Sequence, residues 1–470
     1  MMRSALVIGS LIGWGLGTAC SPASIFACND DAQCNDGVCQ LDVGYCSFPD
    51  PACDSGQRYG DYAGDGLARE CVGDDGESEQ GTTTAATTVT TTLTTTSSPT
   101  TSPADSATTD EPPSDSSGEP LPCSPGWWDC SWGWRMALDV RWSGDVLRDF
   151  PVRVSLLSAR AIPSLFDEGA ADLRFVMDKT GELVPHELDF LAGERGELEV
   201  WVRIPELTPG ARVWMYWGNP GAEDSQDPAA VWSAGYAAVW HMGSELADST
   251  GLHHLEDLGT SQAWGWIGWA RQFDAASGWL QPATEEGFVD LFSGGGTVSA
   301  WIRPDGWGEG GAGRIIDNTV DPDTSQGWAL MVSNEGMSNW APVRFSMDYQ
   351  GDGYASWQSD PDAVELGRWT HVALTHWAQS APENPEVYID GRWEPVEPQS
   401  SANGEPELTS PFPASIGGLG ADQLRIFDGV IDELRLSTVP RSADWLIAEY
   451  ESGLDRMLDY GDPEARPPSP

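Results

Sequence analysis

The sequence predicts an all-β protein with two tandem β-sandwiches, which follow a small disulfide-rich module and a disordered Thr-rich stalk. Three observations predict this fold class. Six cysteines cluster near the N-terminus, a Thr/Ser/Pro tract follows them, and the rest of the chain alternates apolar and polar residues at the period of a β-strand. The predicted parts are a signal peptide (1–19), a lipid-anchored Cys-rich module (20–75), a linker (76–122), a first sandwich (123–238), a second sandwich (239–455) and a tail (456–470).

The charge of the chain limits its partners. It carries 73 acidic and 24 basic side chains, a formal net charge of −49 over 470 residues. Nucleic acid and anionic membrane surfaces would repel this charge, so we expect neither as a direct partner. Divalent cations, neutral glycans and basic proteins remain compatible with it. Solubility in a crowded extracellular setting explains the charge equally well.

The N-terminus indicates export. The stretch MMRSALVIGSLIGWGLGTAC has a basic start at Arg3 and an apolar run from Ala5 to Leu16, which is too short to span a bilayer and predicts a signal peptide. Its ending LGTAC resembles the lipobox of bacterial lipoproteins, with Gly17 where that family prefers Leu. The resemblance implies lipidation at Cys20 and an outer-membrane or cell-surface protein. The alternative is a conventional signal peptide cut nearby.

The nine cysteines fit one lipidated residue and four disulfide bonds. Besides Cys20, they are a block of six and a close pair: Cys28, Cys34, Cys39, Cys46, Cys53, Cys71, and then Cys123 with Cys130. Disulfides imply an oxidising compartment. Zinc is the alternative for the block, but its spacing lacks paired CxxC motifs and it contains no His. The block resembles the disulfide-rich modules near the N-termini of secreted proteins from myxobacterial-type bacteria.

A stalk and a first sandwich follow. The tract GTTTAATTVTTTLTTTSSPTTSP has no aromatic residue and cannot bury enough surface to fold, so it predicts an O-glycosylated stalk or a bare linker. After Cys123, strands such as FPVRVSLL and ARVWMYWGN predict a sandwich. The segments WSGDVLRDFPVRVSL, DLRFVMDKTGELVPHELDF and ELEVWVRIPELTPGARVWMYWGNP resemble domain of unknown function 2341 over residues 124–230. That family occurs in bacterial surface proteins and has no established activity.

A second strand-rich region begins at Val239. Val298, Ala300 and Ile302 share one face of a predicted strand, Asp390-Gly391 forms a hairpin turn, and Ser442 caps a short terminal helix. The pieces ADSTG, VSAWIRP, WTHVAL, VYIDGR and FDGVIDELRL resemble, in order, the laminin-G-like, concanavalin A-type jelly roll over residues 239–455. The resemblance implies two antiparallel sheets packed face to face, one of them concave and able to hold a glycan.

The stretch GVIDELRLS places Asp432 and Glu433 side by side in a predicted strand. Jelly-roll glycoside hydrolases need two carboxylates on one face, because both act on the same glycosidic bond. Strict alternation would send these two to opposite faces, so no catalytic pair within the strand is expected, although a partner from another strand is possible. The resemblance also implies a Ca²⁺ site with Asp248 and Asp432 as ligands. A plain structural role is the alternative.

The chain holds 24 tryptophans, some of which must lie in the cores. Exposed aromatic side chains stack on sugars and anchor interfaces. The acidic hairpin SMDYQGDGYASWQ and its surroundings supply the candidates for an exposed recognition edge: Trp340, Tyr349, Tyr354 and Trp357. Burial in the sandwich core is the alternative for such residues.

These observations favour a non-catalytic cell-surface lipoprotein that binds a glycan or an extracellular protein through its laminin-G-like domain. Adhesion or envelope attachment would be its role, with the membrane reached only through the lipid anchor. A jelly-roll glycoside hydrolase and a purely structural envelope protein are the alternatives.

Overall fold

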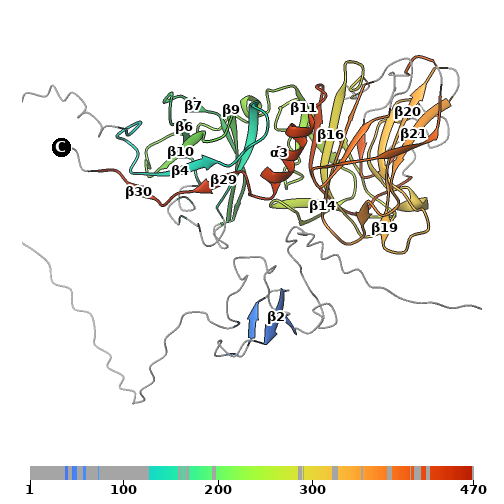
Figure 1. Cartoon of the computed structure of the whole chain (residues 1–470), viewed down its shortest axis with the longest axis horizontal. Coiled ribbons are helices and arrows are strands. Elements are labelled where there is room, and N and C mark those ends of the chain that lie inside the picture. The colour runs from blue at the N-terminus through green and yellow to red at the C-terminus, as the bar shows by residue number, and fades with distance from the viewer. Residues whose placement is uncertain are drawn as a thin grey trace, which may run out of the picture. The chain divides into compact units, whose positions relative to one another are not determined.

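The computed structural model (Figure 1) describes residues 38–40, 45–49, 55, 57–59, 72, 126–156, 160, 162, 165, 169–192, 197–283, 288, 290–319, 326–350, 353–377, 384–402, 404–406, 414–419 and 424–467. The chain forms two compact units, residues 1–117 and 118–470. The predictions made for the signal peptide, the stalk and six cysteines lie outside the described residues: Cys20, Cys28, Cys34, Cys53, Cys71 and Cys123.

The first unit contains a small antiparallel sheet of three strands, β1 (Val38–Gln40), β2 (Tyr45–Pro49) and β3 (Gln57–Tyr59). Cys39 lies opposite Cys46 in the β1–β2 register. Cys130, in the second unit, is disulfide-bonded. The pairing of the cysteines stays a prediction.

The first sandwich consists of two sheets that share one core. The six-stranded sheet contains β29 (Leu458–Tyr460), β4 (Trp134–Val140), β10 (Arg212–Trp217), β6 (Arg174–Met177) and β7 (Leu183–Val184) in this order, with β30 (Glu464–Ala465) also on β4. The three-stranded sheet has the order β5 (Leu147–Leu156), β9 (Glu197–Leu207) and β8 (His186–Ala192). Apolar side chains alternate into the space between the sheets, as Val152 and Val154 of β5 do.

The C-terminal segment completes this sandwich, although its sequence predicts only a tail. Leu458 and Tyr460 of β29 pair with Val140 and Leu138 of β4. Met457 and Leu458 are buried in the core of the first sandwich, at 2% and 5% exposure. These residues therefore form an edge of the first sandwich, although they follow the whole second sandwich in the sequence.

The second sandwich has two eight-stranded antiparallel sheets, as the alternating pattern predicted. The first of these, the inner sheet, contains β13 (Ser261–Trp264), β14 (Trp269–Asp274), β28 (Asp428–Ser437), β16 (Gly296–Pro304), β23 (Thr370–His376), β24 (Glu386–Ile389) and β25 (Arg392–Glu394), with β11 (Tyr236–Trp240) also on β28. The outer sheet contains β12 (Leu255–Asp257), β15 (Leu280–Pro282), β27 (Ser415–Ile416), β17 (Arg314–Asp317), β18 (Trp328–Val332), β20 (Val343–Tyr349), β21 (Gly353–Ser359) and β26 (Val396–Ser400). A small pair, β19 (Trp340–Ala341) and β22 (Val364–Glu365), lies apart from both.

Three local signals of the sequence are confirmed. Val298, Ala300 and Ile302 of β16 all face the core of the second sandwich. Asp390 and Gly391 connect β24 to β25 with φ values of 50° and 69°, as a tight hairpin turn requires. Ser442 caps helix α3 (Ala443–Gly453) by accepting a hydrogen bond from the Trp445 backbone N–H.

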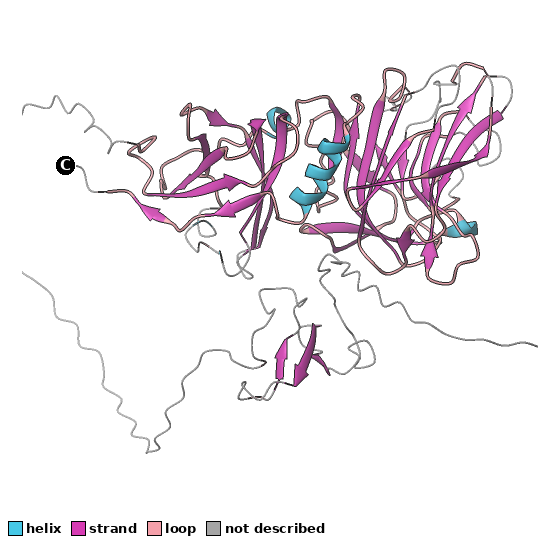
Figure 2. Ribbon diagram, in the orientation of Figure 1, coloured by secondary structure: helices cyan, strands magenta, loops and turns pink. Residues whose placement is uncertain are grey.

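Helix α3 lies between the two sandwiches (Figures 1 and 2). One side of it contributes Trp445 and Leu446 to the core of the first sandwich. Glu449 of the same helix contacts Ser299 of β16 and His371 of β23. The second unit also contains a short helix α2 (Pro228–Val231) and a 3₁₀ helix η3 (Glu309–Gly311). Within the described residues, no helix combines the length and hydrophobicity needed to cross a membrane.

Candidate functional site

Strand β28 does not alternate as expected at Asp432 and Glu433. Glu433 has a φ of 50°, and the pairing of β16 with β28 shifts register between Ser299 and Trp301. Ile431 and Leu434, three positions apart, consequently both face the core. The expectation that the two carboxylates point to opposite faces is therefore wrong. A β-bulge turns both of them away from the core and toward the first sandwich.

These carboxylates belong to a buried polar cluster between the two sandwiches, which we call the inter-sandwich cluster. It contains Glu187 and Asp189 of β8, His241 directly after β11, and Asp432, Glu433 and Arg435 of β28. The β8 pairing with β9 also shifts register, between Leu188 and Phe190, so a second bulge lies at Asp189. Each sandwich thus has a β-bulge at the strand position whose carboxylate lies in the interface between the two sandwiches.

His241 is the centre of the cluster. Its Nδ1 lies 2.7 Å from Oε1 of Glu433 and 3.7 Å from Oδ2 of Asp189. Its Nε2 lies 3.3 Å from Oε2 of Glu187. The ring also stacks on Trp201, with 6.0 Å between centroids and 14° between planes. Each ring nitrogen therefore faces a carboxylate, and the ring has one orientation.

Glu187 is itself held in place. Its Oε2 accepts a hydrogen bond from the Trp232 indole N–H at 2.5 Å, and its Oε1 accepts one from the Ser249 hydroxyl at 2.6 Å. Asp189 is held more loosely, since its Oδ2 accepts a 3.3 Å hydrogen bond from the Trp201 indole N–H. Glu187 beside Nε2 thus has two short hydrogen bonds, whereas Asp189 has one longer one.

Burial and charge shift the pKa values of the cluster in opposite directions. Burial raises the pKa of Asp189 to about 8, despite the nearby charge of His241. Burial also disfavours ionised Glu433, but His241 and Arg435 outweigh it and lower the pKa of Glu433 to about 2. For His241, burial alone would lower the pKa, and the charges of Asp189, Glu433 and Glu187 raise it well above its usual value. Burial therefore favours the neutral form of Asp189, whereas the neighbouring carboxylates favour the charged form of His241.

The charged network extends from the cluster to helix α3. Arg435 donates a 2.6 Å hydrogen bond from Nη2 to Oε2 of Glu433, and its Nη1 lies 3.6 Å from Oε1 of Glu449. Its guanidinium carbon lies 4.4 Å from the Trp201 ring centroid and 4.8 Å from that of Trp232. The interface thus combines cation–π contacts with ion pairs, and these tie β28 to α3 and to the first sandwich.

Three residues of the cluster have the donor atoms of a metal site. Asp189, His241 and Glu433 each offer one ligand atom, and these atoms lie within 4.8 Å of one another. Sequence reasoning missed this group, because its members come from three segments that only the packing of the two sandwiches brings together. The segments VPHELDF, VWHM and GVIDELRLS contain these residues but give no spacing that predicts a metal site.

The residues expected to bind calcium have other partners. Asp248 is 2% exposed and organises its own loop: Oδ1 accepts from the backbone N–H groups of Val239 and Thr250. Oδ2 accepts from the Thr250 hydroxyl and from the N–H groups of Leu252 and His253. Five donors occupy the lone pairs of this carboxylate. Asp432 accepts from Ile267 N–H at 2.9 Å through Oδ2 and contributes to the inter-sandwich cluster.

The prediction of an exposed recognition edge is partly wrong. Tyr349 and Trp357 are 1% and 2% exposed and belong to the core of the second sandwich, so they are not the exposed aromatic residues that were expected. Both lie at positions of β20 and β21 whose side chains point toward the core, between the two sheets. Tyr354 is 40% exposed on β21, and Trp340 is half-buried on β19. Tyr354 is therefore the accessible aromatic residue of this hairpin.

The side of β20 and β21 that faces away from the core is polar, and we call it the polar face. Arg344 lies opposite Gln358, and Ser346 lies opposite Ser356, in the register of the two strands. Nη2 of Arg344 donates a 3.2 Å hydrogen bond to the Ser356 hydroxyl. Arg344 and Ser346 are half-buried, so they keep surface that a ligand can reach, next to exposed Tyr354.

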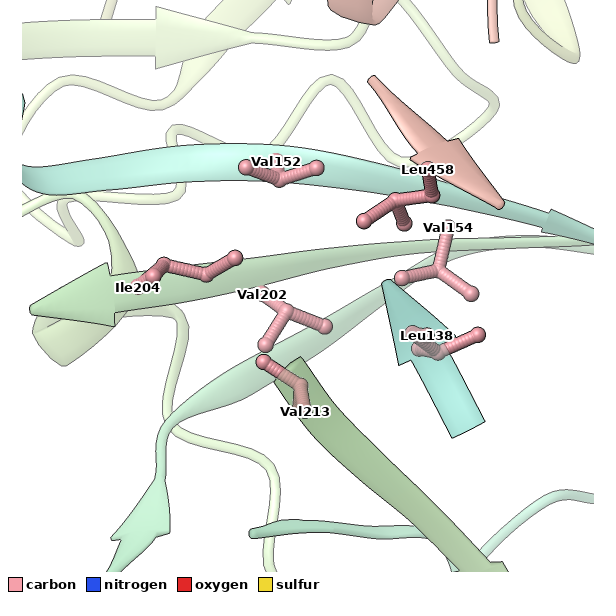
Figure 3. Close-up of a pocket in the computed structure, with 7 residues that line it drawn as sticks. All are labelled: Leu138, Val152, Val154, Val202, Ile204, Val213 and Leu458. Atoms are coloured by element: carbon pink, nitrogen blue, oxygen red, sulfur yellow. The ribbon is translucent and has the colours of Figure 1, made fainter. Parts of the chain in front are cut away.

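Figure 3 shows a small gap inside the first sandwich. It admits no water molecule, and only apolar side chains line it: Leu138, Val152, Val154, Val202, Ile204, Val213 and Leu458. It is a packing gap between two sheets. It has neither the size nor the polar groups of a ligand site.

Comparisons with solved structures give distant likenesses. Domain 4 of an extracellular arabinanase from Geobacillus stearothermophilus, solved with arabinotriose, is 18% identical with a TM-score of 0.33, over 45% of this chain and 96% of that domain. The ligand-binding domain of botulinum neurotoxin serotype D, solved with N-acetylneuraminic acid, is 13% identical with a TM-score of 0.32. That match covers 48% of this chain and about half of the neurotoxin domain (52%). TM-scores this low support no statement about function.

Family models match both sandwiches. No curated protein sequence matches the chain. Residues 169–248, which include Glu187, Asp189 and His241, match the domain of unknown function DUF2341. Residues 276–446, which include Glu433, match the concanavalin A-like lectin/glucanases superfamily. The chain therefore carries a DUF2341 domain followed by a concanavalin A-like lectin/glucanase domain of the laminin-G type.

Proposed function

We propose that this protein binds a glycan through the polar face of its concanavalin A-like domain, without cleaving it, and acts at the cell surface. The observation that supports the proposal is that half-buried Arg344 and Ser346 and exposed Tyr354 lie together on the polar face of β20 and β21. Sugars present hydroxyl groups and weakly polar ring faces. A guanidinium and a hydroxyl group can hydrogen-bond to the sugar hydroxyl groups, and an exposed phenol ring can stack on the face of a sugar ring.

The absence of catalysis is part of the proposal, and the burial of the paired carboxylates supports it. Glycoside hydrolysis needs two carboxyl groups on either side of a bound glycosidic bond. The bulge in β28 does put Asp432 and Glu433 on one side, but they are 0% and 1% exposed. A polysaccharide cannot reach them without separation of the two sandwiches.

The proposed location rests on the N-terminal sequence. Cys20 at the end of a signal peptide would carry the lipid, and the Thr-rich linker would hold the two sandwiches away from the membrane. Mass spectrometry of the membrane fraction tests this proposal. A diacylated N-terminal Cys20 that is lost in Cys20→Ala supports the anchor, and an unmodified Cys20 refutes it.

The binding test uses a glycan array probed with the whole exported chain, because the two sandwiches share helix α3 and a single fragment would expose their interface. We expect saturable binding to one glycan class and a loss of about tenfold in affinity for Tyr354→Ala, from the removed stacking contact. The control is Trp393→Ala on β25 of the inner sheet, which removes a 62% exposed aromatic residue elsewhere.

Two further experiments test whether binding needs calcium and whether the protein cleaves the glycans that it binds. The array is repeated with EDTA, since the calcium ion predicted at Asp248 and Asp432 stays a prediction and would make binding EDTA-sensitive. Polysaccharides that bind are incubated with the protein and assayed for new reducing ends, which a glycoside hydrolase would release. Absence of binding to every glycan would refute the proposal and favour an extracellular protein partner or a structural role.

A further inference from the structure

We propose that Asp189, His241 and Glu433 bind one divalent transition metal ion of the Zn²⁺ class between the two sandwiches. The three ligand atoms lie within 4.8 Å of one another, and Nδ1 of His241 is 2.7 Å from Oε1 of Glu433 and 3.7 Å from Oδ2 of Asp189, so small side-chain shifts suffice to place all three at about 2.0–2.2 Å from one ion. One imidazole nitrogen and two carboxylate oxygens form a donor set typical of zinc and related ions. Calcium, in contrast, prefers oxygen ligands only.

The orientation of His241 makes Nδ1 the ligand atom. Glu187 faces Nε2 at 3.3 Å and is fixed by Trp232 and Ser249, so it accepts the Nε2 proton. A carboxylate on the far nitrogen is the usual arrangement around a metal-bound histidine, because it fixes the tautomer and makes the ligand more basic. Nδ1 then points to Glu433 and Asp189, the two carboxylates that complete the site.

The charges of the inter-sandwich cluster also favour a cation. Three carboxylates, Glu187, Asp189 and Glu433, lie against one imidazole and one guanidinium, and the side chains of all five groups are about nine-tenths buried or more. Arg435 neutralises Glu433 through Oε2 and leaves Oε1 directed at His241. Metal ligands are bound without their protons, so with Asp189 ionised and His241 neutral the three carboxylates exceed the single positive charge of Arg435 by two, which a divalent ion balances.

The backbone supports the same assignment. Asp189 and Glu433 both lie at β-bulges, and Glu433 has a left-handed φ of 50°, a conformation that costs a non-glycine residue free energy. Both bulges aim a carboxylate at His241, and bulges that re-aim side chains in this way are common beside functional sites.

Such an ion would join the two sandwiches. Asp189 comes from β8 of the first sandwich, whereas His241 directly follows β11 and Glu433 lies in β28 of the second. Because the ligands are together only while the interface is intact, metal binding would stabilise the contact between the domains. The free energy gained rises with the ion concentration relative to its dissociation constant.

The test titrates the chelator-stripped whole chain with ZnCl₂ and follows binding by calorimetry and elemental analysis. We expect one ion per chain at this site, and a loss of about 100-fold or more in affinity for Asp189→Asn, which keeps the size of the side chain. Glu187→Gln retains all three ligands and should weaken binding about 10–100-fold. His254→Gln is the control, because it removes an exposed histidine of the neighbouring loop.

Zinc bound by the cysteines of the N-terminal module is distinguished by Co²⁺ substitution. Thiolate ligands give an intense charge-transfer band, whereas the proposed site gives only weak ligand-field bands that Asp189→Asn abolishes. Circular dichroism establishes that each variant is folded. The proposal is overturned if the wild-type chain retains no ion, if Asp189→Asn binds as tightly as His254→Gln, or if the melting temperature is the same with Zn²⁺ and with EDTA.

Discussion

Replacing Leu458 by alanine should destabilise the first sandwich strongly, although this residue lies near the end of the chain. Leu458 is 5% exposed and borders the gap drawn in Figure 3. Removing buried leucine side chains costs about 3–5 kcal/mol, with the larger values where the surroundings cannot collapse. The side chains around this gap are short, branched and held in paired strands, so we expect a loss of about 4 kcal/mol in the free energy of unfolding.

Urea unfolding of the whole chain, followed by tryptophan fluorescence, measures this loss. Leu183→Ala is the matched control, because it makes the same chemical change in the same sandwich at a residue that is 48% exposed. Its expected cost is within about 0.5 kcal/mol. If Leu458→Ala destabilises the protein no more than Leu183→Ala, the C-terminal strand does not belong to the core and the reasoning is refuted.

Three further predictions concern buried polar and aromatic groups. Trp357→Ala should lower the free energy of unfolding by about 3–5 kcal/mol and Tyr354→Ala by much less, as urea unfolding will measure; equal costs would contradict the assigned burial. Glu199→Gln leaves Arg153, its 2.7 Å partner, buried without a full counter-charge and should cost about 3–5 kcal/mol, whereas an unchanged midpoint would show the pair to be dispensable. Burial lowers the pKa of His376 to about 4. Between pH 6.5 and 4 the histidine is therefore protonated in the unfolded chain and neutral in the folded chain. Stability should therefore fall by up to about 3 kcal/mol as the pH drops through this window, and His376→Phe should reduce that fall; a pH profile identical to wild type would contradict the prediction.

Much of the fold could be predicted from local patterns. Alternation along β16 identified which residues face the core, Asp390-Gly391 fixed a hairpin, and Ser442 marked the start of α3. These features depend on residues a few positions apart, so the sequence itself contains the signal.

The candidate site could not be predicted in the same way. Alternation fails at Glu433 because the bulge is set by pairing with β16 and by the ionic contacts of the interface, which no local pattern encodes. Asp189, His241 and Glu433 come together only when two domains pack. For Trp357, sequence alone could not separate a core aromatic from an exposed one, because its strand has large residues on both faces.

The pairing of β29 with β4 has a consequence for the order in which the chain folds. β4 lies near the start of the second unit and β29 near its end, and the entire concanavalin A-like domain is an insertion between β10 and β29. The strand that closes the first sandwich follows the whole concanavalin A-like domain in the sequence, so this sandwich can finish folding only after that domain has been synthesised. Until then one edge of β4 has unpaired N–H and C=O groups that a neighbouring chain can use. Nascent or proteolysed chains that end before residue 458 should consequently associate edge to edge, so β29 protects the first sandwich from this association.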